Sequence, residues 1–245
     1  MIQADSLRKS FSGRGAVRQA VRPALDGLTF SAEDGAITGL VGPNGSGKTT
    51  TLRLITGLLR PESGQVRVDG IDPAQDPMGA RRRLGALTDG LGNYPRLTTR
   101  EHLRYFGELR GMPAVELEAR TRHLLDLFEM HEIADRRAQG FSQGERMKLA
   151  LARAIINDPP NIILDEPANG LDVASARALR TLLERFRDAG KCVLLSSHLM
   201  AEVAAVCNTV VVVARGKVVA QGSPAELMRS SNARSLEEAF VELTA

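Results

Sequence analysis

One segment of the sequence combines flexible glycines with a lysine and a hydroxyl side chain at fixed spacing. It reads Gly42-Pro43-Asn44-Gly45-Ser46-Gly47-Lys48-Thr49. Glycines let the backbone curl so that successive N–H groups point inward, where they can bind phosphate oxygens. In this pattern Lys48 is expected to reach the β- and γ-phosphates of a nucleotide, and the Thr49 hydroxyl to bind Mg²⁺. The alternative, a glycine-rich turn that matches by chance, is disfavoured because an apolar strand is expected before the loop and a helix after it.

Two adjacent carboxylates follow an apolar stretch later in the chain. Residues 161–164 predict a buried strand that ends at Asp165 and Glu166. Beside a phosphate loop, Asp165 can hold Mg²⁺ through water, and Glu166, which faces another direction, can polarise an attacking water. A buried strand that runs into an acidic turn is the simpler alternative. Together with the phosphate loop, the pair favours hydrolysis by water over phosphoryl transfer to a substrate.

A polar turn precedes a helical pattern in the middle of the chain; it reads Phe141-Ser142-Gln143-Gly144-Glu145-Arg146. Ser142 and Glu145 fit a capping box, which would merely start a helix. A helix start with a free N–H at Gly144 is also an anion site, and the two interpretations are compatible. Here the chain resembles the ABC (ATP-binding cassette) ATPase family, whose signature is a Ser-x-Gly-Gln-like turn at a helix start. It departs from the family pattern at Gln143 and Glu145, where Gly and Gln are preferred.

This resemblance implies an enzyme that binds ATP and Mg²⁺ and hydrolyses ATP, with Glu166, His198 and Lys48 as catalytic residues. His198 ends the apolar stretch 194–198 and matches the family's switch histidine, which contacts the γ-phosphate. In the family, the signature turn faces the nucleotide held by a second ATPase subunit, and the D-loop, here 170–172, crosses the same interface. A homodimer is therefore expected, with an interface formed by Ser142, Gln143, Gly144, Glu145 and Asp172.

Two further positions keep open alternatives. Phe11 is a candidate for the aromatic side chain that stacks on adenine, and a core phenylalanine is the alternative. Asp89 falls where ABC ATPases usually end a strand with a glutamine that contacts Mg²⁺. Two interpretations are open: Asp89 takes over the metal contact, or it is a solvated turn residue. Metal binding is thus expected from Thr49, Asp165 and Asp89. The residues expected to bind ATP are Phe11, Gly42, Pro43, Asn44, Gly45, Ser46, Gly47, Lys48, Thr49 and Thr50.

The elements that must position these residues follow from the apolar patterns. Strands are expected at 25–30, 36–41, 66–68, 161–165 and 192–197, a hairpin over 209–220 that turns at Arg215-Gly216, and helices at 49–59, from Pro113 onward, over 147–155 and over 179–186. Strands that alternate with helices imply a mainly parallel sheet covered on both faces. The fold class expected is α/β: a P-loop NTPase (RecA-like) core with an inserted helical subdomain and an antiparallel β portion.

The division predicted for the chain is a single ABC ATPase domain over 1–245. Its core comprises 1–88 and 158–228, its helical subdomain 89–157 and its C-terminal tail 229–245. Of all residues 43% are hydrophobic and 25% charged, which is ordinary for a globular protein, and the net charge is +3. The one tight basic run, 81–83, favours a solvated helix face over a nucleic-acid patch, so no nucleic-acid partner is expected.

The cellular compartment is predicted from the two cysteines, from the lack of a signal-peptide pattern and from the lack of a long apolar run. Cys192 and Cys207 show no metal-ligand spacing and predict buried, reduced thiols, which fits a cytosolic protein. Residues 1–9 lack the apolar block of a signal peptide. The longest apolar run, near 210–214, is far shorter than the roughly 20 residues that span a bilayer. The chain is therefore not expected to cross a membrane by itself.

Resemblance within the ABC ATPases also suggests a role. Residues 236–243 look like the ends of ATPases that serve ABC-2-type exporters, and 81–101 and 141–148 are most similar to sodium-efflux ATPases. This implies a subunit that powers export of Na⁺ or drugs through a separate transmembrane permease, contacted around 93–96. It would be cytoplasmic and peripheral on the inner face of the cell membrane through that permease. The alternatives are a soluble ABC ATPase not coupled to transport and a kinase with the same phosphate loop, which the signature turn and His198 disfavour.

Overall fold

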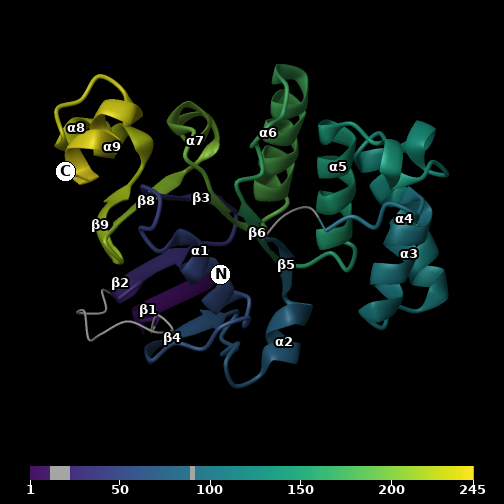
Figure 1. The fold of residues 1–245 in the computed structure, drawn as a ribbon, viewed down its shortest axis with the longest axis horizontal. Coiled ribbons are helices and arrows are strands. Elements are labelled where there is room, and N and C mark those ends of the chain that lie inside the picture. Colours follow the sequence, from purple (N-terminus) through teal and green to yellow (C-terminus); the bar gives the residue numbers. More distant parts are fainter. Residues whose placement is uncertain (12–22, 89–91, 245) are drawn as a thin grey trace, which may run out of the picture.

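A computed structural model describes residues 1–11, 23–88 and 92–244 (Figure 1). The strands are β1 (Ile2–Lys9), β2 (Leu25–Ala32), β3 (Ala36–Val41), β4 (Ser63–Val68), β5 (Leu84–Leu87), β6 (Asn161–Asp165), β7 (Cys192–Ser196), β8 (Thr209–Ala214) and β9 (Lys217–Gly222). The helices are α1 (Lys48–Ile55), α2 (Pro77–Arg82), α3 (Thr99–Leu109), α4 (Ala114–Leu127), α5 (Gln143–Ala154), α6 (Val173–Asp188), α7 (Met200–Val206), α8 (Pro224–Ser230) and α9 (Leu236–Thr244), with 3-10 turns η1 (His131–Ile133) and η2 (Ala138–Gly140).

The described strands form two sheets. The larger has the order β5-β6-β7-β3-β8-β9, in which only β9 runs antiparallel to its neighbour. The smaller is antiparallel, with the order β2-β1-β4. In β7, Val193 and Leu195 join one hydrophobic cluster while Cys192 and Leu194 join another. This alternation means that both faces of the larger sheet are buried, as expected for a parallel sheet.

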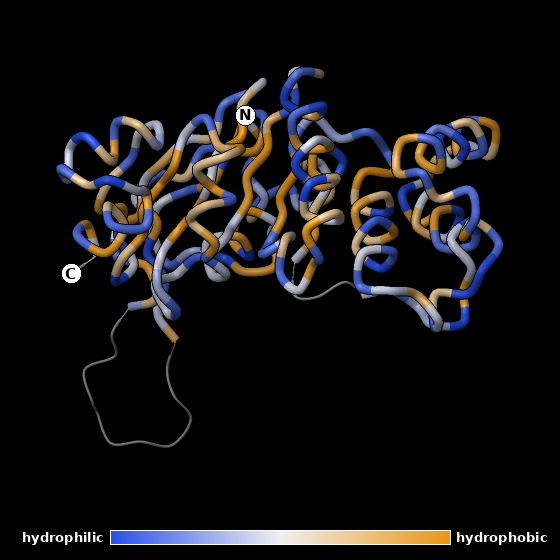
Figure 2. Tube along the Cα trace, turned by 90° about the horizontal axis from the view of Figure 1, so that it is seen from above, coloured by the Kyte–Doolittle hydropathy of each residue, from blue (hydrophilic) through white to orange (hydrophobic). Residues whose placement is uncertain are grey.

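Each face of the larger sheet has its own cover. Leu52, Leu54 and Ile55 of α1 and residues of the smaller sheet, such as Ile2, pack on one face. On the other face lie α5, α6, α7 and α9. The helices α3, α4 and α5 gather at one end of the molecule, and α8 and α9 lie at the opposite end (Figure 1). Seen from above, the strands of the centre are largely hydrophobic, and hydrophilic residues predominate along the outer turns (Figure 2).

Most of the predicted elements are present, and the α/β class with a largely parallel sheet is confirmed. The hairpin turns at Arg215-Gly216, as predicted. The helix predicted over 49–59 was too long: α1 ends at Ile55, because Gly57 adopts a left-handed φ of 69° that closes the last turn. Pro113 was expected at the first helical position and is instead the N-cap of α4.

The two cysteines are buried free thiols, as predicted. Burial raises the pKa of Cys192 and that of Cys207 to about 12 each, so both stay protonated at neutral pH. Within the described residues, no helix combines the length and apolar character that crossing a membrane requires.

Candidate functional site

The glycine-rich loop connects the end of β3 to the start of α1. Gly47, the N-cap of α1, has a left-handed φ of 112°, which favours glycine. A Cβ built on Gly42 would lie 2.2 Å from the carbonyl oxygen of Val213, so only glycine fits there. The loop is fixed on its inner side, since the backbone carbonyl oxygen of Ser46 accepts a hydrogen bond from the backbone N–H of Gly216 at 3.0 Å. Its outer side, Pro43 to Gly45, is exposed.

Lys48 lies inside the curl of this loop, with 9% of its surface exposed. Its Nζ donates to the carbonyl oxygens of Gly42 at 2.6 Å and Pro43 at 3.3 Å. Burial lowers the pKa of the Lys48 ammonium, while the nearby carboxylates of Glu166 and Asp165 act to raise it. The lysine therefore lies within the electrostatic reach of both acidic residues predicted for the site.

The parallel pairing of β6 with β7 positions the acidic pair. Asp165 is in register with Ser196, and the Ser196 hydroxyl donates to Oδ1 of Asp165. Glu166 follows in a left-handed conformation, with φ 50°. Such a conformation is strained for glutamate and persists only where neighbours hold it. Here the Glu166 N–H donates to the carbonyl oxygen and to Oγ of Ser196, at 3.2 and 3.1 Å.

The side chains of Glu166 and His198 are in direct contact. Nδ1 of His198 donates to Oε2 of Glu166 at 2.6 Å, and the His198 backbone N–H lies 3.4 Å from the same oxygen. The two side chains are 27% and 53% exposed, respectively. The structure thus brings Lys48, Asp165, Glu166 and His198 together at the carboxyl ends of β3, β6 and β7, where ligands of open α/β sheets bind.

The polar turn at 142–145 starts α5 as a capping box. Ser142 accepts from the Glu145 N–H at 3.2 Å, and Oε2 of Glu145 accepts from the Ser142 N–H at 2.7 Å. Nη2 of Arg136 donates to both carboxylate oxygens of Glu145, at 3.0 and 2.9 Å. Burial alone would raise the pKa of Glu145, but the hydrogen bond from Ser142 and the charge of Arg136 hold it below its usual range.

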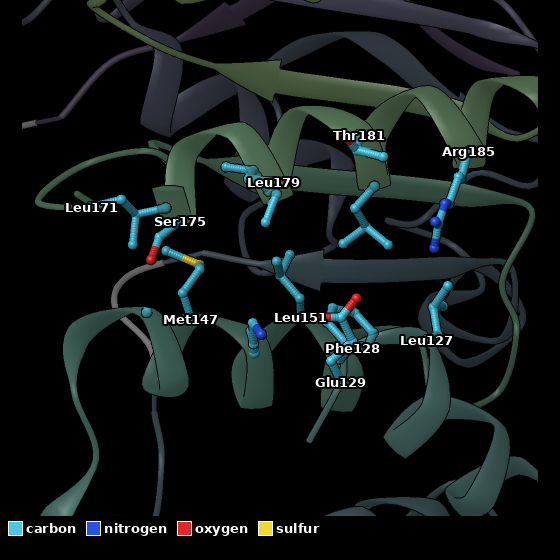
Figure 3. Close-up of a pocket in the computed structure, with 14 residues that line it drawn as sticks. Leu127, Phe128, Glu129, Met147, Leu151, Leu171, Ser175, Leu179, Thr181 and Arg185 are labelled. Atoms are coloured by element: carbon cyan, nitrogen blue, oxygen red, sulfur yellow. The ribbon is translucent and has the colours of Figure 1, made fainter. Parts of the chain in front are cut away.

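The start of α5 lies against the start of α6. A Cβ on Gly144 would be 2.6 Å from Oγ of Ser175, which explains why this position is glycine. Along the two helices, Met147 and Leu151 of α5 point toward Leu179 of α6 (Figure 3). Between them lies a largely apolar cavity of about 230 Å³.

The predicted D-loop residue Asp172 has a local role. It is the N-cap of α6 and accepts from the backbone N–H of Ser175 at 2.8 Å and from its hydroxyl at 3.1 Å. These hydrogen bonds lower the pKa of Asp172. The loop before it approaches the signature turn, since a Cβ on Gly170 would lie 3.7 Å from Nε2 of Gln143.

The sequence profile of the ABC transporter family matches residues 25–169, which is more than half of the chain. The chain belongs to the ABC transporter family. It is 38% identical over 98% of its length to the ABC transporter ATP-binding protein NatA of Bacillus subtilis, covering 97% of that protein. It is 35% identical over 98% of its length to the Nod factor export ATP-binding protein I of Paraburkholderia xenovorans, covering 76% of that protein.

Among solved structures, the fold matches an ATP-binding subunit of an ABC transporter with a TM-score of 0.86 and 31% identity, over 100% of this chain and 99% of that one. The chain is therefore an ATP-binding subunit of the ABC type and an ATPase. Cassettes of this family dimerise and work with a separate membrane permease.

The phosphate loop of this ABC ATPase fits a nucleotide in two ways. The backbone at Gly42 is so close to Val213 that no side chain could occupy the curl, and Oγ of Ser46 is buried without a hydrogen-bond partner in the described structure. A phosphate oxygen could supply that partner. Thr49 is exposed at the start of α1 and Thr50 half-buried beside it.

The donor set also fits Mg²⁺. The described residues contain no group of three or more His, Cys, Asp or Glu side chains that could hold a metal by themselves. Mg²⁺ does not need one, because it usually binds through one or two carboxylates together with water and substrate phosphates. The Thr49 hydroxyl and the Asp165 carboxylate are such a partial set.

The two remaining predicted positions stand apart from this centre. Phe11 is 51% exposed, so it is not the core phenylalanine that was the alternative, and its ring lies 5.8 Å from Nζ of Lys9. The stacking role of this exposed ring stays a prediction. Asp89 lies outside the described residues, so its metal contact stays a prediction.

Sequence reasoning missed two residues of this site. Ser196 binds both Asp165 and the Glu166 backbone, although it had been quoted only as part of an apolar stretch. The signal was available, because a hydroxyl two residues before His198 falls opposite the acidic pair if the strands are parallel. Arg136, the partner of Glu145, had no such signal, since it lies nine residues away across a turn.

Proposed function

We propose that this ABC ATPase powers export as a pair of subunits attached to a separate transmembrane permease. Each ATP would be bound by the phosphate loop of one chain and by the signature turn of the other. Among the described residues, no hydrogen bond or ion pair joins the loop at 42–49 to the turn at 142–145. A second copy related by two-fold symmetry would complete both sites at once.

The observation that carries the catalytic proposal is the contact between Glu166 and His198. A carboxylate fixed by two N–H groups of one residue has a defined direction, and a positioned carboxylate can polarise an attacking water. Lys48 would bind the β- and γ-phosphates, and Thr49 and Asp165 would hold Mg²⁺. The bound ion would neutralise charge on the phosphate oxygens. His198 would hold Glu166 and contact the γ-phosphate.

We further propose where the permease binds. Leu58, Met78 and Leu109 are exposed large apolar side chains, from 55 to 65%, around a cavity of about 670 Å³. The same cavity is lined by Arg81, Arg82 and Arg110 and by Thr88. This chemistry suits a cytoplasmic segment of the permease that carries apolar and acidic side chains.

The neighbouring surface predicted at 93–96 would relay motion to the signature helix. Nδ2 of Asn93 donates to the backbone carbonyl of Arg146 on α5 at 2.9 Å. Tyr94, Pro95 and Arg96 line a second hollow at this end of the molecule. A shift of this segment would therefore pull on the helix that begins at the signature turn. The helical subdomain, 89–157, is proposed as the moving part of the single domain, with the core and tail divided as predicted.

The binding surface can be tested by co-purification of this subunit with its permease. Leu109→Asp should abolish recovery of the complex from membranes, because it places a charge among the apolar side chains. Val115→Asp is the matched control: Val115 is 85% exposed on α4 and does not line the cavity. If both variants lose the complex to the same extent, or if neither loses it, the proposed binding surface is wrong.

The transport function is tested by reconstituting the purified complex in vesicles. ATP-dependent movement of Na⁺ should be compared with that of organic cations, since the resemblances point to Na⁺ or drug efflux. The alternative is an ABC ATPase that is not coupled to transport. That alternative predicts recovery in the soluble fraction whether or not a permease is present, whereas the proposal predicts a peripheral location on the inner face of the membrane that depends on the permease.

A further inference from the structure

Glu145 poses an electrostatic problem for the proposed split site. It lies in the first turn of α5, with Ser142, where the helix start would otherwise offer its N–H groups to phosphate oxygens. Its carboxylate already accepts the Ser142 N–H at 2.7 Å, and its lowered pKa keeps it ionised at neutral pH. A bare negative charge at this place would repel a triphosphate.

Arg136 is placed to remove that repulsion. Its Nη2 donates to Oε1 and Oε2 of Glu145 at 3.0 and 2.9 Å. The guanidinium also lies over the ring of Phe141, with Cζ 5.0 Å from the centroid, and Nη2 is 3.4 Å from the carbonyl oxygen of Gly140. Phe141 is 4% exposed, so the arginine rests on a fixed platform.

The guanidinium keeps unused hydrogen-bonding capacity. All its described hydrogen bonds come from Nη2, so Nε and Nη1 do not donate within the described structure. Half of the Arg136 side chain is exposed, against 26% for Glu145. The cation is therefore the outer member of the pair, and an approaching anion meets the positive charge first.

We infer that Arg136 is a positioning residue that acts through Glu145: it neutralises the signature turn so that the turn can receive the triphosphate bound by a second copy of this chain. This inference rests on the proposed split site. It assigns to the pair a role that neither residue has alone. Arg136 without Glu145 is dispensable, and Glu145 without Arg136 is harmful.

A double-mutant cycle tests this dependence, with ATP hydrolysis by the full-length protein as the measurement. Arg136→Ala should raise the ATP concentration for half-maximal hydrolysis about tenfold (~1.4 kcal/mol), while the maximal rate changes much less. Arg136→Lys should retain most of the parent affinity, because it keeps the charge. In a Glu145→Gln background, Arg136→Ala should have almost no effect, since no charge remains to be neutralised.

Salt separates an electrostatic role from a structural one. The defect of Arg136→Ala should shrink between about 0.1 M and 1 M KCl, because the Debye length falls from about 10 to about 3 Å. Arg137→Ala is the matched control: it removes an adjacent exposed arginine whose charge acts on Glu101 instead. Nucleotide binding by the isolated chain, which uses the phosphate loop, should be unchanged in every variant.

Three results would overturn the inference. The first is an Arg136→Ala variant that needs no more ATP for half-maximal hydrolysis than the parent. The second is an Arg136→Ala defect that is as large in the Glu145→Gln background as in the parent. The third is an Arg136→Ala defect that salt does not reduce. In each case hydrolysis by the parent protein would still support the proposed function. Absence of hydrolysis and of an ATP-dependent dimer in the parent would instead overturn the proposed split site, and the inference with it.

Discussion

Oε2 of Glu166 accepts a hydrogen bond from Nδ1 of His198 at 2.6 Å, which joins the residue that follows β6 to the segment that follows β7. The contact depends on the parallel register of the two strands, in which Asp165 faces Ser196. The carboxylate of Asp165 accepts a hydrogen bond from the Ser196 hydroxyl, whereas the carboxylate of Glu166 accepts one from His198. These different side-chain donors to the two carboxylates support separate roles in metal binding and in catalysis.

Glu166→Gln should bind ATP normally and lose nearly all turnover, by at least about 10²-fold, because an amide cannot polarise the attacking water. A dimer that cannot hydrolyse its nucleotide should then accumulate. Size-exclusion chromatography with ATP and Mg²⁺ would detect it, and chromatography with ADP is the control. Turnover at the parent rate would remove Glu166 from the catalytic role.

His198→Ala should lower the maximal rate about tenfold or more while nucleotide binding to the isolated chain persists, since Glu166 loses the donor that orients it. The chain offers a matched control in His131→Ala. His131 makes a contact of the same kind, with Nε2 2.6 Å from Oδ1 of Asp126, but on the helical part of the molecule. An equal loss in both variants would point to general destabilisation, which thermal unfolding would reveal.

Ser142→Arg should abolish hydrolysis while leaving ATP binding to the isolated chain unchanged, because the bulk and charge obstruct the site of the partner copy. Lys48→Ala damages the cradle of its own copy instead. Mixing the two variants should restore activity, since a mixed dimer contains one complete site. Steady-state ATPase rates at several mixing ratios would measure this recovery.

Ser223→Arg is the control for the Ser142 variant. Ser223 caps α8 through an equivalent capping box with Glu226. Loss of this cap should lower the free energy of unfolding by about 1 kcal/mol. It should not abolish hydrolysis, so mixing with Lys48→Ala is not needed for activity. If no mixture of Ser142→Arg and Lys48→Ala recovers activity, the shared-site geometry fails or both sites must be intact for either to work.

The phosphate loop and the acidic strand could be predicted from the sequence because each is a local pattern with fixed spacing. The contact of Glu166 with His198 could not, since 32 positions separate the residues and only the pairing of β6 with β7 brings them together. The ion pair of Arg136 with Glu145 depends on how two side chains cross a turn, which no residue spacing encodes.

Strand β1 and the end of α1 were also beyond the local pattern, for identifiable reasons. Strand β1 was not predicted because its alternation is broken: Ser6 has a left-handed φ of 49°, and the register shifts between Ala4 and Leu7. The helix after the phosphate loop was extended too far because the apolar spacing of Leu52 and Ile55 continues to Leu59. The periodicity of apolar residues does not take into account Gly57, whose left-handed φ closes the last turn of α1.

Asp89→Ala should raise the Mg²⁺ concentration needed for half-maximal ATPase and leave metal-free nucleotide binding unchanged, if Asp89 takes the metal contact that a glutamine usually makes. Asp89→Gln should recover much of the loss, because the amide keeps an oxygen ligand. Titration of activity with Mg²⁺ at fixed ATP would measure both. If Asp89→Ala shows the same Mg²⁺ dependence as the parent, Asp89 does not bind the metal. Mechanical coupling would then be the one role left for this loop.

Acid sensitivity is expected at the surface proposed to relay motion from the permease. His102 is fully buried; its Nδ1 donates to the carbonyl oxygen of Thr98, and its Nε2 accepts the Tyr94 N–H, both at 2.8 Å. Burial lowers the pKa of His102, and the charge of Arg153 lowers it further. The hydrogen bond to the Thr98 carbonyl and the charge of Glu101 act to raise it, but the pKa stays below its ordinary value. Protonation would replace the acceptor at Nε2 with a second N–H and break the bond to Tyr94.

The sign of the effect follows from this lowered pKa. The unfolded chain binds the proton near the ordinary value of 6.5, more readily than the folded chain. The contribution of His102 to stability is therefore complete above about pH 6.5 and is lost as the pH falls from there toward the lowered pKa of the folded state. His102→Gln keeps an acceptor without a titrating group, so it should cost about 1–3 kcal/mol at neutral pH but flatten this acid loss.

Tyrosine fluorescence can report this change locally. The chain has no tryptophan and only two tyrosines, Tyr94 and Tyr105, which pack against each other with ring centroids 5.8 Å apart. Urea unfolding followed by fluorescence at about pH 7.5 and pH 5.5 should show the loss in the parent and much less of it in His102→Gln. His123→Gln, which changes an exposed histidine on α4, should behave like the parent. If acid weakens the His102→Gln variant as strongly as the parent, the proton acts elsewhere, and the Tyr94 anchor does not respond to pH.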